Sequence, residues 1–437
     1  RALRLSTERL RSLVVHPRSA RDRARGVQRV TAGAATTFGE LWRAVPPFVP
    51  FCAPSESRCI TLGGALASNV YSRASARGGL LAEHVTGFSL ATPAGRVLRC
   101  APDENAPLFA AVPGGLGALG VADEITLELR DTSTIRAVGS EVLARTRSAD
   151  ELASSLAEGL DDTEWHLGRY ALVHGDASRA GATVLRSRYL GALAGFEDCG
   201  PMPGHGRSVA ESAAHVVAHL WPAVCDTAAR AALRPGLRFV DRLEDFTFFQ
   251  DAYVTSRRAL ARSRAARALV GVTGRSPSLP LAQQAFVVPD GALPRFLYAV
   301  GSTLRRFAGV AKRVVLQDVL RLPASAALMA PAWPSAGAWI YTLSIPINIA
   351  QRARVEAALR AVARVAWHSA RARVHLLKAV FCDDELLREM WRPQLEQLAA
   401  LRREHDPAAL IDSALLGRLL PRGPQRHTST VMSRRRG

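Results

Sequence analysis

Apolar and polar residues alternate along several short stretches of the first 130 residues, as they do in half-buried β-strands. EITLELRD at 124–131 has an apolar side chain at every second position, and VQRVTAG at 27–33 alternates in the same way. FSLATPAGRVLRC at 88–100 predicts a hairpin that turns at 93–95, and TTFGELWRAV at 36–45 predicts a short helix. This part of the chain is therefore expected to be rich in short strands.

From about residue 134 the pattern changes to apolar runs separated by helical stretches. The strand candidates are WHLGRYALV (165–173), QQAFVVP (283–289), RVVLQDVLRL (313–322) and WIYTLSIPI (339–347). Helices are predicted at 207–220, 291–307 and 352–370, and a long amphipathic helix is predicted at 383–407 with a kink at Pro393. This mixture predicts an α+β fold with an antiparallel sheet.

A chain of 437 residues with 48% hydrophobic and 22% charged residues is typical of a globular protein with two lobes. Its six cysteines form no CxxC pair, which favours a reducing compartment and disfavours structural zinc. No uninterrupted apolar run is long enough to span a bilayer. A cytoplasmic protein is the expectation.

The net charge of +19 raises the question of nucleic acid. Of 57 basic residues only Lys312 and Lys378 are lysines, and the arginines are spread over most segments without aromatic neighbours on one element. A nucleic-acid-binding face would need such a cluster. An anionic membrane surface or a phosphorylated substrate is a better match for this charge. The one dense basic cluster, 422–437, is predicted to be a disordered tail.

Glycine-rich stretches occur at 61–68, 76–85 and 113–121, each beside a predicted strand. In CITLGGALASNVYSR, a strand-like run meets Gly63 and Gly64, where glycine is a loss unless something approaches the backbone closely. One such stretch alone is equally consistent with a tight turn, but three favour a ligand that lies against backbone N–H groups. Neither the Rossmann GxGxxG pattern nor the P-loop pattern fits.

The motif order APSESRCITLGGALASNVYSR, GGLLAEHV, FSLATPAGRVLRC and LFAAVPGGLGALGVADEITLEL resembles the FAD-binding domain of the vanillyl-alcohol oxidase / p-cresol methylhydroxylase family. The likeness covers nearly all of 26–130. AQQAFVVP, VLQDVLRL, AWIYTLSIPI, RVHLLKAVF and LRREHDPAALIDSALLGRL are similar, in the same order, to segments of its decaprenylphosphoryl-β-D-ribose 2-oxidase branch. The resemblance implies a two-lobed α+β fold: an FAD-binding domain at 1–133, a substrate domain with an antiparallel sheet at 134–372, and a return to the first domain at 373–421.

The cofactor that this resemblance implies is non-covalent FAD. The residues expected along its pyrophosphate and flavin are Ser57, Thr61, Leu62, Gly63, Gly64, Tyr71, Ser72 and Arg73, with Ala122 by the adenine and His375 by the isoalloxazine. Tyr71 stands where many relatives have histidine, including those that attach flavin covalently. Simpler readings stay open: the glycines as turns, and His375 as a hydrogen-bonded, partly buried histidine.

The resemblance implies catalytic roles for Lys378, Arg321 and Tyr71, and substrate contacts for Gln283, Thr342 and Arg321. Lys378 matches the family's active-site lysine, whose cation would hold a sugar hydroxyl and stabilise negative charge as hydride leaves for flavin N5. A surface lysine at a strand end is the alternative. Arg321 matches a second lysine that meets the substrate.

Several positions depart from the family. Thr342 replaces a cysteine, Ala285 a glutamine and Ile340 an asparagine, and FFQD at 248–251 stands where relatives have an aromatic residue followed by Pro-Leu-Asp. The family's glycine-rich pyrophosphate loop would precede the segment that matches 3–11, so we expect either a fragment or a protein that retains flavin weakly. The substrate pocket is therefore expected to be altered.

Two hypotheses follow. The first is an FAD-dependent oxidoreductase that oxidises a secondary hydroxyl of a sugar or polyol, with a polyprenyl-phosphate-linked sugar of cell wall biosynthesis as the narrower option. The second is a non-catalytic member of the fold that serves as a binding or scaffold protein. The sequence has no GxSxG motif of the kind that a serine hydrolase would carry. His215 and His219 lack the glutamate of an HExxH motif, so no metal site is expected. The electron acceptor is unknown, and peripheral membrane association is an expectation that recovery of all the protein in the soluble fraction at low salt would contradict.

Overall fold

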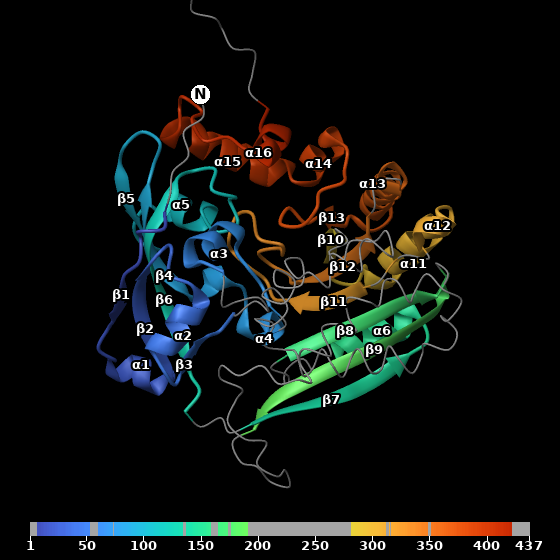
Figure 1. Cartoon of the computed structure of the whole chain (residues 1–437), viewed down its shortest axis with the longest axis horizontal. Coiled ribbons are helices and arrows are strands. Elements are labelled where there is room, and N and C mark those ends of the chain that lie inside the picture. The colour runs from blue at the N-terminus through green and yellow to red at the C-terminus, as the bar shows by residue number, and fades with distance from the viewer. Residues whose placement is uncertain are drawn as a thin grey trace, which may run out of the picture.

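The computed structural model describes residues 7–52, 60–72, 74–133, 137–158, 165–173, 176–190, 281–311, 314, 316–347 and 351–421. The helix predicted at 207–220, the FFQD segment and the tail at 422–437 lie outside these residues. Helices and strands alternate along the rest of the chain, and they form two sheets with helices packed on them (Figure 1). This mixture of helices and antiparallel strands confirms the predicted α+β class.

The first sheet has six strands in the order β1-β2-β6-β4-β5, with β3 also paired to β6. The strands are β1 (Leu13–Val15), β2 (Val27–Gly33), β3 (Phe48–Pro50), β4 (Val85–Ala91), β5 (Val97–Cys100) and β6 (Val121–Asp131). The predicted strand at 27–33, the hairpin at 88–100 and the strand at 124–131 are confirmed. Ile125, Leu127 and Leu129 point into the core with exposed fractions of 1%, 1% and 0%, as their alternation predicts.

Short helices connect the strands of this sheet: α1 (Ala20–Ala24), α2 (Phe38–Ala44), α3 (Leu62–Ser68), α4 (Ser75–Gly78), the 3₁₀ turn η2 (Leu81–His84) and α5 (Ala106–Ala111). Helix α2, predicted at 36–45, begins with a capping box. The Glu40 N–H donates to Thr37 Oγ1 at 3.2 Å, and the Thr37 N–H donates to Glu40 Oε2 at 2.7 Å. Phe38 and Leu41 then bury the apolar face of the helix.

The second sheet has seven antiparallel strands in the order β13-β10-β12-β11-β8-β9-β7. They are β7 (Ala137–Thr146), β8 (Trp165–Val173), β9 (Asp176–Leu190), β10 (Leu281–Pro289), β11 (Leu316–Leu322), β12 (Ala338–Pro346) and β13 (Arg373–Val374). The four strands predicted from the apolar runs are confirmed as β8, β10, β11 and β12. Strands β7 and β9 were not predicted.

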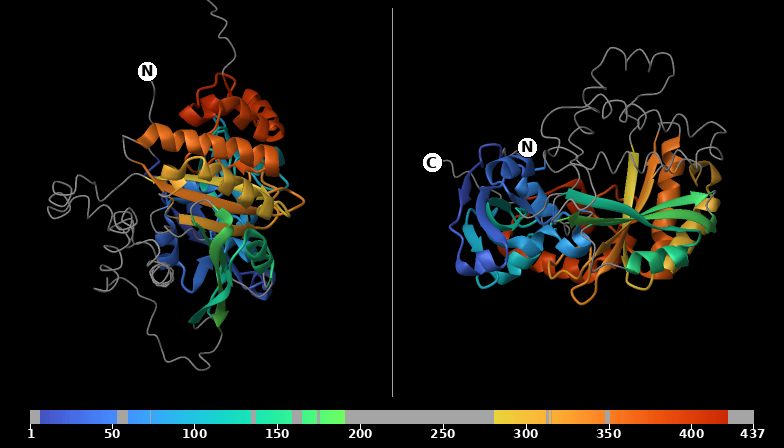
Figure 2. Two further views of the ribbon diagram at one scale, coloured as in Figure 1. Left: turned by 90° about the vertical axis from the view of Figure 1, so that its right-hand side faces the viewer. Right: turned by 90° about the horizontal axis from the view of Figure 1, so that it is seen from below.

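Helices cover one face of the second sheet (Figure 2, left): α6 (Ala149–Ala157), α11 (Leu293–Arg305), α12 (Ala308–Ala311) and α13 (Arg352–Ala370). Phe296 of α11 packs against Phe286 of β10 and Tyr341 of β12, with ring centroids 5.5 and 5.1 Å apart. Because side chains alternate along a strand, the residues next to Phe286 in β10 and next to Tyr341 in β12 point to the opposite face. Helix α4 of the first sheet's unit packs against β8 and β11.

The C-terminal segment starts at the edge of the second sheet with β13 and continues as α14 (Asp384–Met390), α15 (Arg392–His405) and α16 (Ala414–Leu419). These helices extend from α13 to the helix α5 of the first unit (Figure 1). The single kinked helix predicted at 383–407 is wrong, because the helix is broken at Trp391. This residue has φ −114° and ψ 11°, and its buried indole N–H donates to the Val374 carbonyl at 3.0 Å. Helix α15 begins at Arg392, and Pro393, which lacks an N–H, lies in its first turn, where no intrahelical N–H bond is lost.

None of the helices in the described ranges is long and apolar enough to cross a membrane.

Candidate functional site

Thr61 forms an isolated antiparallel bridge with Thr37, and α3 begins directly after it, so Gly63 and Gly64 lie in a helix and not in a strand. Thr61 is the N-cap of α3, and its Oγ1 accepts from the Gly64 N–H at 3.3 Å. A Cβ on Gly63 would lie 2.9 Å from the Cβ of Ala34, in the turn that follows β2. The glycine at 63 is therefore required by the close packing of α3 on this turn.

The amides at the start of α3 are all engaged within the protein. The Leu62 N–H donates to the Thr36 carbonyl and the Gly63 N–H donates to the Ala34 carbonyl, each at 2.8 Å. The Gly64 N–H is held by Thr61, as described above. The sequence predicts that the backbone of these residues lies along the pyrophosphate and flavin, but in the structure their N–H groups hold the helix in place.

The outer face of α3 carries only small side chains. Leu62, Ala65 and Leu66 are buried, whereas Gly64 is exposed and Ala67 and Ser68 are half-buried. The last three share a face because they are three and four residues apart, and Tyr71 follows at the end of the helix. This face allows a flat ring system to approach the helix.

The other two glycine stretches also approach protein atoms. The Gly114 and Leu116 N–H groups donate to the Leu66 and Ala67 carbonyls at 3.0 and 2.9 Å, and so they cap the C-terminus of α3. Gly114 has φ +76°, and a Cβ there would lie 3.1 Å from the Met329 carbonyl oxygen of the second unit. In the stretch 76–85, His84 stacks on Phe51 with ring centroids 4.2 Å apart.

Asn69 ends α3 in the left-handed conformation and is fully buried. Its Oδ1 accepts from the Ala82 N–H at 2.9 Å. Within the described ranges, its Nδ2 has no hydrogen-bond partner. The C-terminus of α3 therefore holds a buried donor without an acceptor among the described residues.

The loop after β13 carries the predicted residues His375 and Lys378. The His375 N–H donates to the Ala285 carbonyl at 2.8 Å, and the Ala379 N–H donates to the Gln283 carbonyl at 2.7 Å. The loop therefore runs along β10 on both sides of Lys378. Arg373 in β13 lies between the rings of Trp333 and Trp391, with its guanidinium carbon 4.8 and 5.3 Å from their centroids.

Tyr71, His375 and Lys378 come together from opposite ends of the sequence. The Tyr71 and His375 rings meet edge to face, with centroids 5.5 Å apart and planes at 82°. His375 is 2% exposed. Burial, together with the charge of Lys378, lowers the pKa of His375 to about 3. His375 is thus neutral at pH 7, while Lys378 is exposed and carries the positive charge here.

Polar side chains from β10 and β12 lie beside this loop. The Gln283 Nε2 donates to Ser344 Oγ at 3.1 Å across the two strands. Thr342 is directly opposite Ala285, and it is 8% exposed. These residues alternate with Phe286 and Tyr341, so they point away from α11. The structure thus places Gln283 and Thr342 on one face of the sheet.

Arg321 lies on the opposite face of the same sheet. It is paired with Trp339 in the register that pairs Asp318 with Thr342, and an offset of three positions along each strand places the two pairs on opposite faces. Its guanidinium stacks on the Trp339 ring at 5.2 Å and forms an ion pair with Asp290 at 2.5 Å. The structure therefore does not bring Arg321 together with Lys378, Gln283 and Thr342.

The other predicted residues are dispersed. Ser72 is buried, and its N–H donates to Ser75 Oγ at 2.9 Å in the turn that starts α4. Ala122 lies opposite Leu90 in the first sheet and is half-buried. Ser57 and Arg73 lie outside the described residues.

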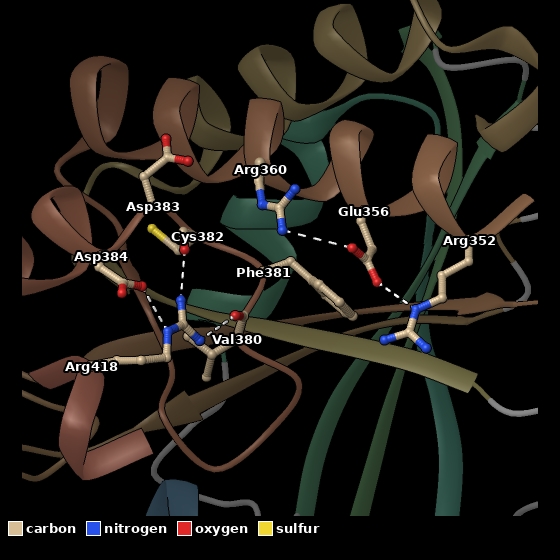
Figure 3. Close-up of a pocket in the computed structure, with 9 residues that line it drawn as sticks. All are labelled: Arg352, Glu356, Arg360, Val380, Phe381, Cys382, Asp383, Asp384 and Arg418. Atoms are coloured by element: carbon tan, nitrogen blue, oxygen red, sulfur yellow. Dashed lines mark hydrogen bonds and ion pairs between the residues drawn. The ribbon is translucent and has the colours of Figure 1, made fainter. Parts of the chain in front are cut away.

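Sequence analysis missed two side chains that hold the Lys378 loop. Gln284 is fully buried, and its amide joins the Leu359 carbonyl to the Phe381 N–H. Its polar side chain at an apolar position of QQAFVVP was the available clue. Arg418 of α16 holds residues 380–384 beside a cavity of about 510 Å³ (Figure 3). An arginine in an arginine-rich sequence gave no comparable clue.

Comparison with known proteins identifies the first unit. Residues 12–101 match the FAD binding domain family, a segment that includes α3 and Tyr71. The chain is 33% identical over 141 residues to an "Uncharacterized protein in mprA 5'region" of Streptomyces coelicolor, which is 32% of this chain and 36% of that protein. It is 31% identical over 140 residues to (R)-6-hydroxynicotine oxidase of Paenarthrobacter nicotinovorans, which is 31% of this chain and 30% of that protein.

The chain thus carries an FAD-binding domain, and the predicted cofactor, FAD, is confirmed. Nothing in the match indicates a covalent link. The matches span about a third of the length of these curated relatives. The residues present fit the ring end of the cofactor: α3 has an outer face of small residues, the Asn69 Nδ2 lacks a partner in the part of the chain that the structure describes, and Tyr71 and His375 meet at the end of the helix.

Proposed function

We propose that this protein is an FAD-dependent oxidoreductase that oxidises a secondary hydroxyl of a sugar or polyol. The observation that supports this most is the meeting of Tyr71, His375 and Lys378 at the end of α3. Tyr71 belongs to the segment that matches the FAD binding domain, and the other two come from the C-terminal segment. When bound, FAD supplies a two-electron acceptor that takes a hydride at N5.

Lys378 is the residue that meets the substrate in this proposal. Its ammonium donates to the hydroxyl oxygen of the substrate and stabilises the negative charge that develops there as the C–H bond breaks. The hydride leaves from carbon, the hydroxyl proton leaves as H⁺, and a carbonyl remains. His375 is neutral at pH 7, because the pKa of its ring is about 3, and so it adds no competing positive charge. Its buried ring holds Tyr71 edge to face.

The substrate class rests on the sheet face beside the loop. Gln283 is half-buried on this face, with the buried hydroxyl groups of Ser344 and Thr342 beside it, and in this proposal its amide pairs with a substrate hydroxyl as donor or acceptor. A sugar linked to a polyprenyl phosphate is the narrower proposal, and only the sequence resemblance supports it. With such a substrate, the protein would associate peripherally with membranes; sedimentation with anionic vesicles at low salt would test this, and no co-sedimentation would contradict it.

A non-catalytic binding protein is the second candidate function. It is favoured by the engaged N–H groups of Leu62, Gly63 and Gly64, because a domain that offers few backbone donors to the pyrophosphate holds its cofactor less tightly. The two candidates differ in one observable property. Only the enzyme transfers electrons from a substrate to its flavin.

The first experiment is the visible absorption spectrum of the purified protein, before and after gel filtration with added FAD. If a flavin spectrum stays with the protein, the second step is to add D-arabinose or D-ribose anaerobically and to measure the rate at which the flavin absorption is bleached. We expect Lys378→Ala to slow bleaching roughly 100- to 1000-fold, the usual loss for one group that stabilises developing charge. Lys312→Ala, which removes the other lysine of the chain, is the control and should leave the rate unchanged.

A folded protein that takes up no FAD would refute the enzyme and leave the binding protein. An FAD-bound protein that neither sugar bleaches would refute the substrate class.

A further inference from the structure

Arg418 of α16 faces the loop that follows Lys378. Its guanidinium forms a wall of the cavity between α13 and the loop, and the other lining residues are Arg352, Glu356, Arg360, Val380, Phe381, Cys382, Asp383 and Asp384 (Figure 3). Three arginines and three carboxylates line this cavity, so their charges balance. The cavity therefore has no excess charge that would select an ionic ligand, and the contacts of Arg418 call for another explanation.

Arg418 makes three hydrogen bonds to three alternate residues of the chain. Nη1 donates to the Val380 carbonyl at 2.9 Å, Nη2 to the Cys382 carbonyl at 2.6 Å, and Nε to Asp384 Oδ1 at 2.7 Å (Figure 3). A planar guanidinium with fixed donor directions can span such a segment, whereas an ammonium is a single point charge. Two of the three acceptors are backbone carbonyls, so this contact sets the path of the main chain.

The other side of the loop is held by β10. The Ala379 N–H is bonded to the Gln283 carbonyl at 2.7 Å, and the Phe381 N–H is bonded to Gln284 Oε1 at 3.0 Å. The bond from Arg418 to the Val380 carbonyl falls between these two. The loop is therefore fixed from both sides only two residues after Lys378.

Helix α16 is itself tied to α14. The Arg388 Nη1 donates to the Arg418 carbonyl at 3.1 Å, so the residue that holds the loop is held by the helix into which the loop leads. Cys382 is buried beneath this contact with an exposed fraction of 4%. The loop, α14 and α16 thus form one locally closed unit.

We infer that Arg418 is a positioning residue for Lys378. The inference rests on the proposed function, in which the Lys378 ammonium must stay within hydrogen-bond reach of a substrate hydroxyl. A shift of the loop by about 1 Å would move that ammonium out of position, a displacement that can cost about 100-fold in rate. Arg418 prevents the shift without contact to substrate or cofactor.

The test compares Arg418→Met and Arg418→Lys with the control Arg352→Met. Arg352 lines the same cavity, and its substitution removes the same charge. Its side chain is 72% exposed, however, and pairs only with Glu356 among the residues described. The first measurement is amide hydrogen exchange of peptides that cover 379–384 in the full chain with FAD added. Because hydrogen bonds from a charged group are lost, we expect about 10- to 100-fold faster exchange in Arg418→Met. Arg418→Lys should give a smaller increase and Arg352→Met none.

The second measurement is the bleaching rate with D-arabinose or D-ribose, in single variants and in combination with Lys378→Ala. If Arg418 acts through Lys378, Arg418→Met slows bleaching alone and has little further effect once Lys378 is gone. Full additivity of the two losses would overturn the inference. So would unchanged exchange at 379–384, or exchange raised equally throughout the protein. If wild type is not bleached, the proposed function fails, while the exchange data still decide whether Arg418 holds the loop.

Discussion

Gln284 offers a sharp test of how the Lys378 loop is held, because its side chain is a fully buried amide with a partner at each end. Nε2 donates to the Leu359 carbonyl of α13 at 3.3 Å, and Oε1 accepts from the Phe381 N–H of the loop at 3.0 Å. Gln284→Met keeps the volume of the side chain and removes both bonds. The Phe381 N–H then loses its partner, whereas the Leu359 carbonyl keeps the bond that it accepts within α13.

The cost follows from the Phe381 N–H. A polar group that loses its partner destabilises the folded state by about 1–3 kcal/mol, so we expect a loss of about 1–3 kcal/mol in the free energy of unfolding. The neighbouring Gln283→Met is the matched control. Gln283 lies on the opposite face, is half-buried, and donates only to Ser344 Oγ among the contacts described here, so we expect a loss below about 1.5 kcal/mol.

Gln284→Glu adds a pH dependence with a definite sign. The carboxyl must be protonated to donate to the Leu359 carbonyl, and burial disfavours its charged form, so the pKa of this glutamate in the folded protein is raised above its ordinary value. The folded state then binds the proton more tightly than the unfolded state. Stability relative to wild type is therefore highest below about pH 4 and falls as the pH rises through the folded pKa.

The assay is urea unfolding of wild type, Gln284→Met, Gln284→Glu and Gln283→Met at pH 4.5, 6 and 8, followed by tryptophan fluorescence. If Gln284→Met loses no more stability than Gln283→Met, the amide does not carry the energy assigned to it. A deficit of Gln284→Glu that is the same at pH 4.5 and 8 would refute the burial argument.

His375 and Gly63 give two further predictions. The pKa of His375 is lowered to about 3, so the folded state stays neutral while the unfolded state gains a proton below pH 6.5. Stability should therefore fall by about 1.4 kcal/mol per pH unit as the pH drops from 6.5 toward 3, and His375→Phe should remove this part of the slope; an equal slope in both proteins would contradict it. Gly63→Ala should cost about 1–3 kcal/mol because its Cβ would meet Ala34, whereas Gly64→Ala, whose Cβ would meet only Thr61 Oγ1 at 3.1 Å, should cost less in the same urea assay; equal losses would be inconsistent with this packing.

Periodicity predicted the strands where one sheet face is buried. In 124–131 every second residue is buried, so apolar and polar residues alternate, and this alternation can be recognised from the segment itself. Helix α13 begins and ends at the predicted residues 352 and 370, because burial of one helix face repeats apolar residues every three or four positions. The break at Trp391 was not predicted, because the preference of its indole for the Val374 carbonyl is a tertiary contact. Pro393 alone indicates only a kink.

The glycines show why a local pattern can mislead about its cause. Gly63 was interpreted as a place where a ligand approaches, but the close neighbour is Ala34, 29 residues earlier in the chain. Glycine reports that something is near and does not say what it is. Arg321 shows a similar limit: its charge was visible in VLRL, but only the register of β11 against β12 decides which face it occupies.

The site itself joins two parts of the chain that no local pattern connects. The segment that matches the FAD binding domain ends at residue 101, so it contains Tyr71 but neither His375 nor Lys378. These two reach the end of α3 because β13 pairs with β10, and because Gln284 and Arg418 then fix the loop that follows. The cofactor-binding part alone therefore lacks the cation of the proposed reaction. Relatives that share only this part with the chain can differ in substrate, since the residues that would meet the substrate lie outside it.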